Sequence, residues 1–197
     1  MTALCVYCGS QEGRDKRHAE AARRLGEALA KRGITLVYGG GGIGLMAVLA
    51  DAVLAGGGRA VGVLPRHFVT SELLPTGSSR FGDRSEILIT DTMHRRKQEM
   101  FERSDGFVVL PGGFGTLDEF FEVLTWRQIG LHDKPIIVID GDGYWEPLLG
   151  LLDHLVAQGF TSRRAREGVV VVRTIEELFQ ALDRAPEPRS KTLLTPF

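Results

Sequence analysis

The chain has 197 residues, of which 43% are hydrophobic, and this size and composition are compatible with one compact domain around a single core. Its 24 Lys and Arg residues against 25 Asp and Glu residues give a formal net charge of -1, which argues against the basic surface that nucleic acid or acidic lipid requires. No run reaches the roughly 18 apolar residues of a membrane span, and the N-terminal stretch MTALCVYCGS does not resemble a signal peptide. We therefore expect a cytoplasmic protein that binds neither membrane nor nucleic acid.

Short apolar runs alternate with segments of helical period along the whole chain. The runs predict buried strands at ALCVYC, ITLVY, AVGVL, EILIT, GFVVL, PIIVI and VVVV. Helices are expected at residues 17–31, 45–54, 93–103, 117–129, 144–157 and 175–182. This order predicts an α/β fold, Rossmann-like and doubly wound, with a mainly parallel sheet and helices on both faces. Ligands of such folds bind beyond the carboxyl ends of the strands.

Cys5 and Cys8 form a C-x-x-C pair, which raises a redox or metal-binding interpretation. The pair falls in a predicted strand, where residues an odd number apart point to opposite faces of the sheet. Two buried core thiols are therefore the favoured interpretation.

Two segments fall outside the regular alternation. Residues 66–85 make a long connection between two strands, so we expect a short helix or a lid there. The tail APEPRSKTLLTPF, residues 185–197, is either a frayed end or an arm that packs on a partner chain. Residues 1–184 are accordingly expected to form a single Rossmann-like nucleotide-binding domain.

The stretch YGGGGIGL contains a G-x-G-x-x-G pattern at Gly39, Gly41 and Gly44, between a strand and a helix. A dinucleotide site would need an acidic residue at the end of the next strand, but AVGVL runs into Pro65 and Arg66. An NAD site is therefore disfavoured, whereas a mononucleotide or a phosphate remains open. Neither glycine cluster ends in the Lys and Ser or Thr of a P-loop.

A second glycine cluster, PGGFGT, also lies between a predicted strand and a predicted helix. Its amides would sit at the positive end of the helix dipole, which favours an anion such as phosphate. The alternative is a tight turn in which glycine serves local geometry only. Thr116 and Glu119, which follow, have the T-x-x-E spacing of a capping box, but Glu119 is also close enough to the loop to orient a sugar hydroxyl or a water.

The predicted helix MHRRKQEMF carries Met93, Arg96 and Met100 on one stripe. A guanidinium on an apolar face needs a partner, so Arg96 should meet either a ligand phosphate or a carboxylate in an internal salt bridge. Arg95 points about 100° away and is expected in solvent. His94 is expected at the surface or at an interface.

The motifs YGGGGIGLM, MHRRK and PGGFGTLDE, together with TWRQIGLHDKP and DGYW, resemble those of the Lonely Guy family of nucleotide phosphoribohydrolases, formerly labelled lysine decarboxylases. The resemblance implies hydrolysis of the N-glycosidic bond of a purine nucleoside 5′-monophosphate, AMP or an N6-modified cytokinin nucleotide, to free base and ribose 5-phosphate. It implies Arg96 and Glu119 as catalytic residues and no metal or cofactor. It further implies a homodimer, for which Phe120, Phe121, Leu124 and Trp126 would supply packing surface.

Substrate and phosphate binding are assigned by the same resemblance to residues around these motifs: Gly9, Ser10, Gly41, Gly42, Glu72, Met93, Lys97, Pro111, Gly112, Gly113, Gly115 and Thr116. This sequence departs from the family pattern at two places, and both concern substrate preference. Ala47 stands where the family often has glycine, and the segment of residues 66–85 is a few residues longer than in the short members.

Two other functions stay open. A nucleotide or molybdenum-cofactor carrier of similar fold would bind its ligand without turnover. A pyridoxal-dependent decarboxylase would need a Schiff-base lysine, but none of the lysines lies in a recognisable cofactor motif: Lys16, Lys31, Lys97, Lys134 and Lys191.

Overall fold

The computed structural model describes residues 1–69 and 82–185, and the elements named below belong to these residues. The strands are β1 (Ala3–Tyr7), β2 (Thr35–Tyr38), β3 (Ala60–Pro65), β4 (Ser85–Thr90), β5 (Gly106–Val109), β6 (Ile136–Ile139) and β7 (Val169–Val172). The α-helices are α1 (Lys16–Lys31), α2 (Gly44–Ala55), α3 (Met93–Glu102), α4 (Phe114–Gln128), α5 (Glu146–Ala157), α6 (Arg163–Glu167) and α7 (Ile175–Arg184). Two short 3₁₀ turns, η1 (Arg66–Phe68) and η3 (Gly82–Arg84), lie on either side of the undescribed segment.

All seven strands are parallel and form one sheet in the order β4-β3-β2-β1-β5-β6-β7. The chain builds the sheet outward from β1 in one direction as far as β4, then returns to place β5 on the other side of β1. The strand order therefore reverses between β1 and β5. In open parallel sheets this switch point leaves a crevice at the carboxyl ends of the two strands, where ligands bind.

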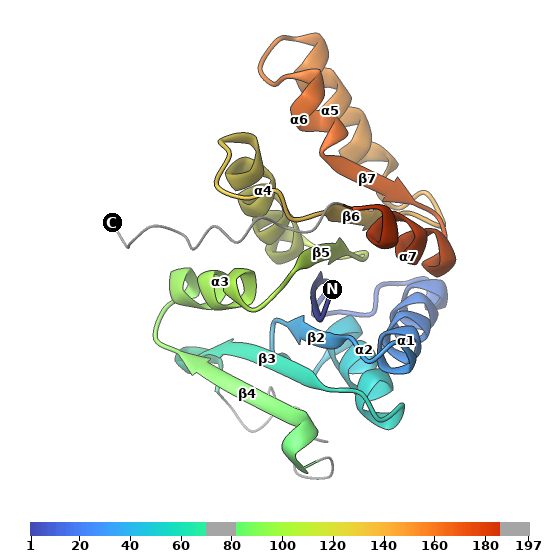
Figure 1. Cartoon of the computed structure of the whole chain (residues 1–197), viewed down its shortest axis with the longest axis vertical. Coiled ribbons are helices and arrows are strands. Elements are labelled where there is room, and N and C mark those ends of the chain that lie inside the picture. The colour runs from blue at the N-terminus through green and yellow to red at the C-terminus, as the bar shows by residue number, and fades with distance from the viewer. Residues whose placement is uncertain (70–81, 186–197) are drawn as a thin grey trace.

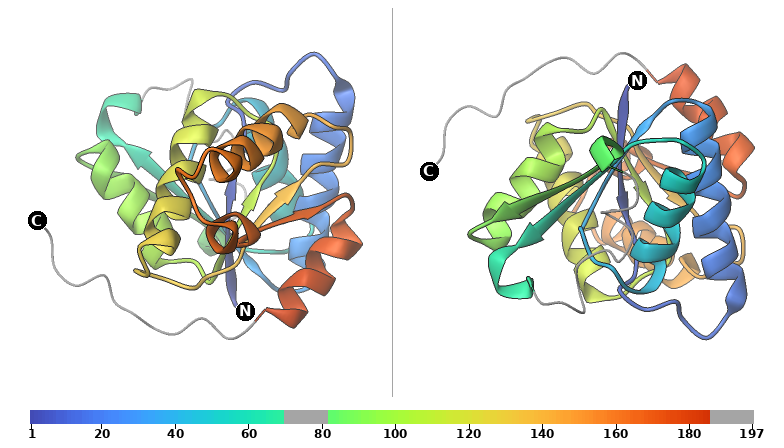
Figure 2. Two further views of the ribbon diagram at one scale, coloured as in Figure 1. Left: turned by 90° about the horizontal axis from the view of Figure 1, so that it is seen from above. Right: turned by 90° about the horizontal axis from the view of Figure 1, so that it is seen from below.

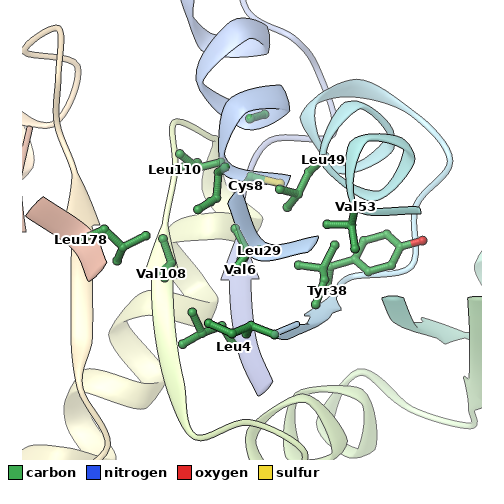
Figure 3. Packing of buried hydrophobic residues seen from close by; sticks show 14 of the residues in the cluster. Leu4, Val6, Cys8, Leu29, Tyr38, Leu49, Val53, Val108, Leu110 and Leu178 are labelled. Carbon is green, nitrogen blue, oxygen red and sulfur yellow. The ribbon is translucent and has the colours of Figure 1, made fainter. Parts of the chain in front are cut away.

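The helices cover both faces of the sheet, as the alternation predicted (Figures 1 and 2). Buried side chains of α1, α2 and α7 form one core cluster with one face of the sheet, which includes Leu4, Val6, Leu29, Leu49 and Leu178 (Figure 3). Buried side chains of α3, α4 and α5 form a second cluster on the opposite face. The inner strands are thus apolar on both sides, which is why they appear in the sequence as continuous apolar runs, whereas the edge strands β4 and β7 have exposed positions.

The two cysteines confirm this arrangement. Cys5 belongs to the cluster under α3 and α4, whereas Cys8 belongs to the cluster under α1 and α2, so their side chains lie on opposite faces of the sheet. Both thiols are free and buried, and burial raises the pKa of each well above its usual range. The interpretation as two core thiols is correct.

Most predicted helices begin and end within two residues of the observed ones, with one clear exception at α4. This helix begins at Phe114, three residues before the predicted start at residue 117, because the second half of the glycine cluster is itself helical. The short helix α6 was not predicted. Residues 70–81 and 186–197, which include Glu72 and nearly all of the tail, lie outside the described residues. No described helix is long and apolar enough to cross a membrane.

Candidate active site

A cavity of about 410 Å³ opens at the switch point between β1 and β5. The segments around it follow the carboxyl ends of several strands, and one backbone contact joins two of them: the amide of Gly9 donates to the carbonyl of Pro111 at 3.0 Å. The lining comprises Val6, Cys8, Gly9, Ser10, Gly39, Gly41, Ile43, Met46, Leu64, Pro65, Phe68, Met93, Arg96, Gly113, Phe114, Gly115, Thr116, Asp118 and Glu119. The volume lies within the range of small-molecule sites.

The loop after β5 brings the N-terminus of α4 to this cavity. Gly113 is the N-cap of the helix and has no side chain with which to cap it. Among the described residues, no backbone or side-chain acceptor is bonded to the amides of Gly113, Phe114 or Gly115. A Cβ atom added to Gly113 or Gly115 would meet no atom within 4 Å, and neither residue has a positive φ. Protein packing therefore does not require glycine here, and free amides at a helix N-terminus favour an anion.

The loop after β2 is constrained by the protein itself. Gly40 and Gly44 have φ of 76° and 61°, in the left-handed region that favours glycine. A Cβ atom on Gly44 would lie 2.3 Å from the carbonyl carbon of Ser10, so this loop and the loop after β1 are in direct backbone contact. The amide of Leu45 donates to the carbonyl of Gly9 at 3.0 Å across the same contact. The first glycine cluster thus shapes the wall of the cavity.

Arg96 and Glu119 form a buried ion pair at the cavity, with 2.5 Å between Nη1 of Arg96 and Oε1 of Glu119. Arg96 also donates from Nε to the carbonyl of Val63 at 3.0 Å and from Nη2 to the carbonyl of Gly39 at 3.4 Å. The predicted buried guanidinium is thus found, and its partner is a carboxylate. Burial raises the pKa of Glu119 above its usual value, although the positive charge of Arg96 acts in the opposite direction.

The capping-box interpretation of Thr116 and Glu119 is wrong. Both residues lie inside α4, which begins at Phe114, so Thr116 is too far along the helix to be the N-cap. Thr116 is buried and lines the cavity, while the Glu119 side chain turns to Arg96 of α3. The pattern T-x-x-E occurs here in the first two turns of a helix whose start is set by the glycine before it.

The structure brings together most of the residues that the sequence assigned to binding. Gly9, Ser10, Gly41, Met93, Gly113, Gly115 and Thr116 all line the cavity with the two catalytic candidates. Gly42, Lys97, Pro111 and Gly112 do not line it. Lys97 instead bonds Asp118 at 3.2 Å and Glu122 at 3.0 Å on α4. These ion pairs fasten α3 to α4 and so keep Arg96 beside Glu119.

Sequence reasoning missed the apolar half of the cavity. Ile43, Met46, Leu64, Phe68 and Phe114 line it, and Phe114 is 92% exposed. They come from three segments that are far apart in the sequence and that the sheet order brings together, so no local sequence pattern predicts them. For Ile43, Phe68 and Phe114, the one available signal was a position shortly after a predicted strand or within a glycine cluster.

The proposed packing surface for a second copy is largely used within the chain. Phe120 is fully buried, and Phe121, Leu124 and Trp126 pack against the core cluster under α3 and α4.

Arg95 is half-exposed and pairs with Glu99 of its own helix, which agrees with its expected place in solvent. Among the described residues, no group of three or more His, Cys, Asp or Glu side chains could hold a metal ion.

Comparison with known proteins assigns the chain to a family. The family model described as "Possible lysine decarboxylase" matches residues 46–182. The chain is 44% identical over 180 residues to the cytokinin riboside 5′-monophosphate phosphoribohydrolase LOG3 of Arabidopsis thaliana, with 91% of this chain and 81% of that protein covered. It is 42% identical over 182 residues to the phosphoribohydrolase LOG of Oryza sativa subsp. japonica, with 91% and 72% covered.

The fold and the site thus define a Rossmann-like hydrolase of the phosphoribohydrolase class. The chain belongs to the Lonely Guy family of cytokinin riboside 5′-monophosphate phosphoribohydrolases, as its motifs indicated.

Solved structures share the fold at much lower sequence identity. The molybdenum cofactor binding protein of Rippkaea orientalis is 20% identical with a TM-score of 0.66, covering 92% of this chain and 95% of that one. The Moco carrier protein of Chlamydomonas rheinhardtii is 18% identical, also with a TM-score of 0.66, covering 93% and 96%. At such identities the likeness concerns the fold alone.

Proposed function

We propose that this chain hydrolyses the N-glycosidic bond of a purine nucleoside 5′-monophosphate, with AMP or a cytokinin nucleotide as substrate. The observation that carries the proposal is the buried Arg96–Glu119 pair, which lies in one cavity with amides at the start of α4 that are bonded to no acceptor in the described part of the chain. The identity of 42–44% to phosphoribohydrolases supports the same reaction.

The phosphate would lie at the N-terminus of α4. The amides of Gly113, Phe114 and Gly115 would donate to its oxygens, and the Thr116 hydroxyl is beside them. The open space around Gly113 and Gly115 lets the phosphate approach the backbone closely. In a chain of net charge -1, such local donors supply the attraction that the overall charge does not.

The reaction step would take place at Glu119. Cleavage of the bond between C1′ and the base nitrogen leaves positive charge on the ribose ring, and a carboxylate beside the ring stabilises that charge. The same carboxylate can orient a water, whose oxygen becomes the new C1′ hydroxyl while the base leaves with a proton. Arg96 holds the carboxylate in place and favours its ionised form.

The base would occupy the apolar half of the cavity. Ile43, Leu64, Phe68 and Phe114 offer surface against which a purine can pack. Ile43, Phe68 and Phe114 are also partly exposed at the rim, so an apolar substituent on N6 would find apolar contacts there. This feature favours a cytokinin nucleotide over AMP.

The proposal is tested by incubating the purified protein with AMP and with isopentenyladenosine monophosphate, and by quantifying free base and ribose 5-phosphate by chromatography. Equimolar release of both products is expected, faster from the prenylated nucleotide. Nucleotide binding without release of base would contradict the proposal and favour a carrier.

The homodimer and the lack of a nucleic-acid partner are also proposed, as is the cytoplasmic location. A dimer would place the exposed Phe114 and the apolar rim of each cavity near a second copy, which would cover apolar surface. Sedimentation at micromolar concentration checks this, since a mass near 22 kDa, that of one chain of 21.6 kDa, would contradict it.

A further inference from the structure

The glycine loop after β5 has a contact that lies outside the cavity lining. The hydroxyl of Tyr144 donates to the carbonyl oxygen of Gly112 at 2.7 Å. Gly113, the next residue, lines the cavity, whereas neither Gly112 nor Tyr144 does. Tyr144 therefore contacts the loop outside the cavity lining, and the reaction chemistry proposed above makes no use of it.

The contact controls the orientation of one peptide group. Gly112 supplies the carbonyl and Gly113 the amide of the same peptide, which is planar and trans. In such a peptide the C=O and N–H bonds point in opposite directions. When Tyr144 holds the oxygen, the N–H of Gly113 points away from the Tyr144 hydroxyl, and Gly113 is the residue of this peptide that lines the cavity. Glycine on both sides of the peptide would otherwise leave this orientation poorly fixed.

Tyr144 is itself held by a residue of α1 and by residues of its own connection between β6 and α5. The ring of His18, in the first turn of α1, lies edge-on to it at 5.4 Å, and the ring of Trp145 lies at 4.8 Å. Asp142 accepts from the amide of Tyr144 at 3.3 Å through Oδ1, and its Oδ2 lies 3.1 Å from Nδ1 of His18. A side chain that is 41% exposed is thus fixed in one position.

We propose that Tyr144 is a positioning residue for phosphate binding: through the Gly112 carbonyl it keeps the Gly113 amide directed at the phosphate of the substrate. The inference rests on the proposed function for the identity of that substrate. His18 and Asp142 serve the same end by fixing the Tyr144 ring. The affinity for the part of the substrate that carries the phosphate depends on this contact, and the affinity for the base does not.

The test compares Tyr144→Phe with the wild type in equilibrium binding of two fragments, ribose 5-phosphate and adenine. Phenylalanine keeps the contacts of the ring with His18 and Trp145 and removes only the donor. Ribose 5-phosphate is expected to bind roughly three- to tenfold more weakly, the effect of one hydrogen bond. Adenine affinity should remain unchanged, the melting temperature should fall by about 4 °C at most, and KM for the nucleotide should rise with little change in kcat.

A matched control is Thr125→Val. The Thr125 hydroxyl likewise donates to a backbone carbonyl at 2.7 Å, that of Phe121, but further along α4 and outside the cavity lining. This variant should bind both fragments as the wild type does. Equal loss in the two variants, or parallel loss of ribose 5-phosphate and adenine affinity in Tyr144→Phe, would overturn the positioning role and indicate a general structural one.

The two proposals fail in different ways. A wild-type chain that binds ribose 5-phosphate but releases no base contradicts the hydrolase and leaves the binding comparison valid. Wild-type turnover with unchanged ribose 5-phosphate affinity in Tyr144→Phe contradicts the role of Tyr144 alone. A wild-type chain that does not bind ribose 5-phosphate contradicts both.

Discussion

The loop after β2 and the loop after β5 border the same cavity, but the protein constrains their glycines differently. In the first loop, Gly40 and Gly44 have positive φ, and Gly39 and Gly44 leave no room for a Cβ atom. In the second loop, Gly113 and Gly115 have ordinary φ and open space around them. The difference separates glycines that the fold requires from glycines that a ligand would require, and substitution by alanine distinguishes the two kinds.

The largest expected effect is that of Gly44→Ala. A Cβ atom there meets backbone atoms of Ser10 and Gln11 within 2.4 Å, and φ is 61°. We expect the free energy of unfolding to fall by about 3 kcal/mol or more, or the chain not to fold. Urea denaturation measures this. Gly159→Ala is the control, because Gly159 has φ of 77° but an added Cβ would meet no atom within 4 Å. The free energy of unfolding of this variant should fall by only about 1 kcal/mol.

Gly39→Ala should lower the reaction rate as well as the stability. Its Cβ atom would lie 2.2 Å from Nη2 of Arg96, which must then move and take Glu119 with it. A displacement of the order of 1 Å in a catalytic group costs about a hundredfold in rate. We expect kcat to fall by about that factor. If kcat stays within twofold of the wild type, the position of Arg96 does not matter for the reaction.

Gly115→Ala should separate stability from binding. Gly115 lies in the first turn of α4 with no atom near its added Cβ, so alanine should stabilise the helix by roughly 0.5–1 kcal/mol. The same methyl group would stand where the phosphate approaches, so ribose 5-phosphate should bind about tenfold more weakly. Thermal unfolding and calorimetry measure the two effects.

Gly150→Ala is the matched control for this experiment. Gly150 is exposed within α5, also has no atom within 4 Å of an added Cβ, and lies outside the cavity. The stability gain should be similar and the affinity unchanged. If Gly115→Ala retains full affinity for ribose 5-phosphate, the second loop is a turn and not a phosphate site.

The smallest expected effect is on the pH dependence of the reaction. It involves both loops, because Arg96 contacts Gly39 in the loop after β2 and pairs with Glu119, which follows the loop after β5. Burial raises the pKa of Glu119, and the reaction needs the ionised carboxylate. The value of kcat/KM should therefore increase as pH rises through a pKa above that of an ordinary glutamate. A profile whose acid limb lies at or below the ordinary value would contradict the assignment of Glu119.

The sequence predicted the sheet and its helices well because strands buried inside a parallel sheet are apolar on both sides, as at PIIVI. It predicted Arg96 as buried because the residue shares a helical stripe with Met100. It placed the start of α4 too late and so left a capping box at Thr116 open as one of two interpretations, because helical glycines resemble a loop in sequence. Contacts that depend on topology, such as that of Tyr144 with Gly112, have no local signal.

The role of Lys97 shows the same limit. Its place beside Arg96 in MHRRK suggested the rim of the site, but one residue along a helix turns a side chain by about 100°. In the structure, Lys97 forms ion pairs with Asp118 and Glu122 on α4. Neighbours in a motif can thus serve the site in different ways, one inside the cavity and one by holding two helices together.

The most direct test of the account is the rate of base release from saturating nucleotide by the wild type and by Glu119→Gln, with ribose 5-phosphate affinity measured on the same samples. Glutamine keeps a hydrogen-bond acceptor for Arg96 but removes the charge that would stabilise the transition state. We expect the rate to fall by about a thousandfold while ribose 5-phosphate binds within a few fold of the wild type. Base release near the wild-type rate would contradict the catalytic role of Glu119 and, with it, the mechanism.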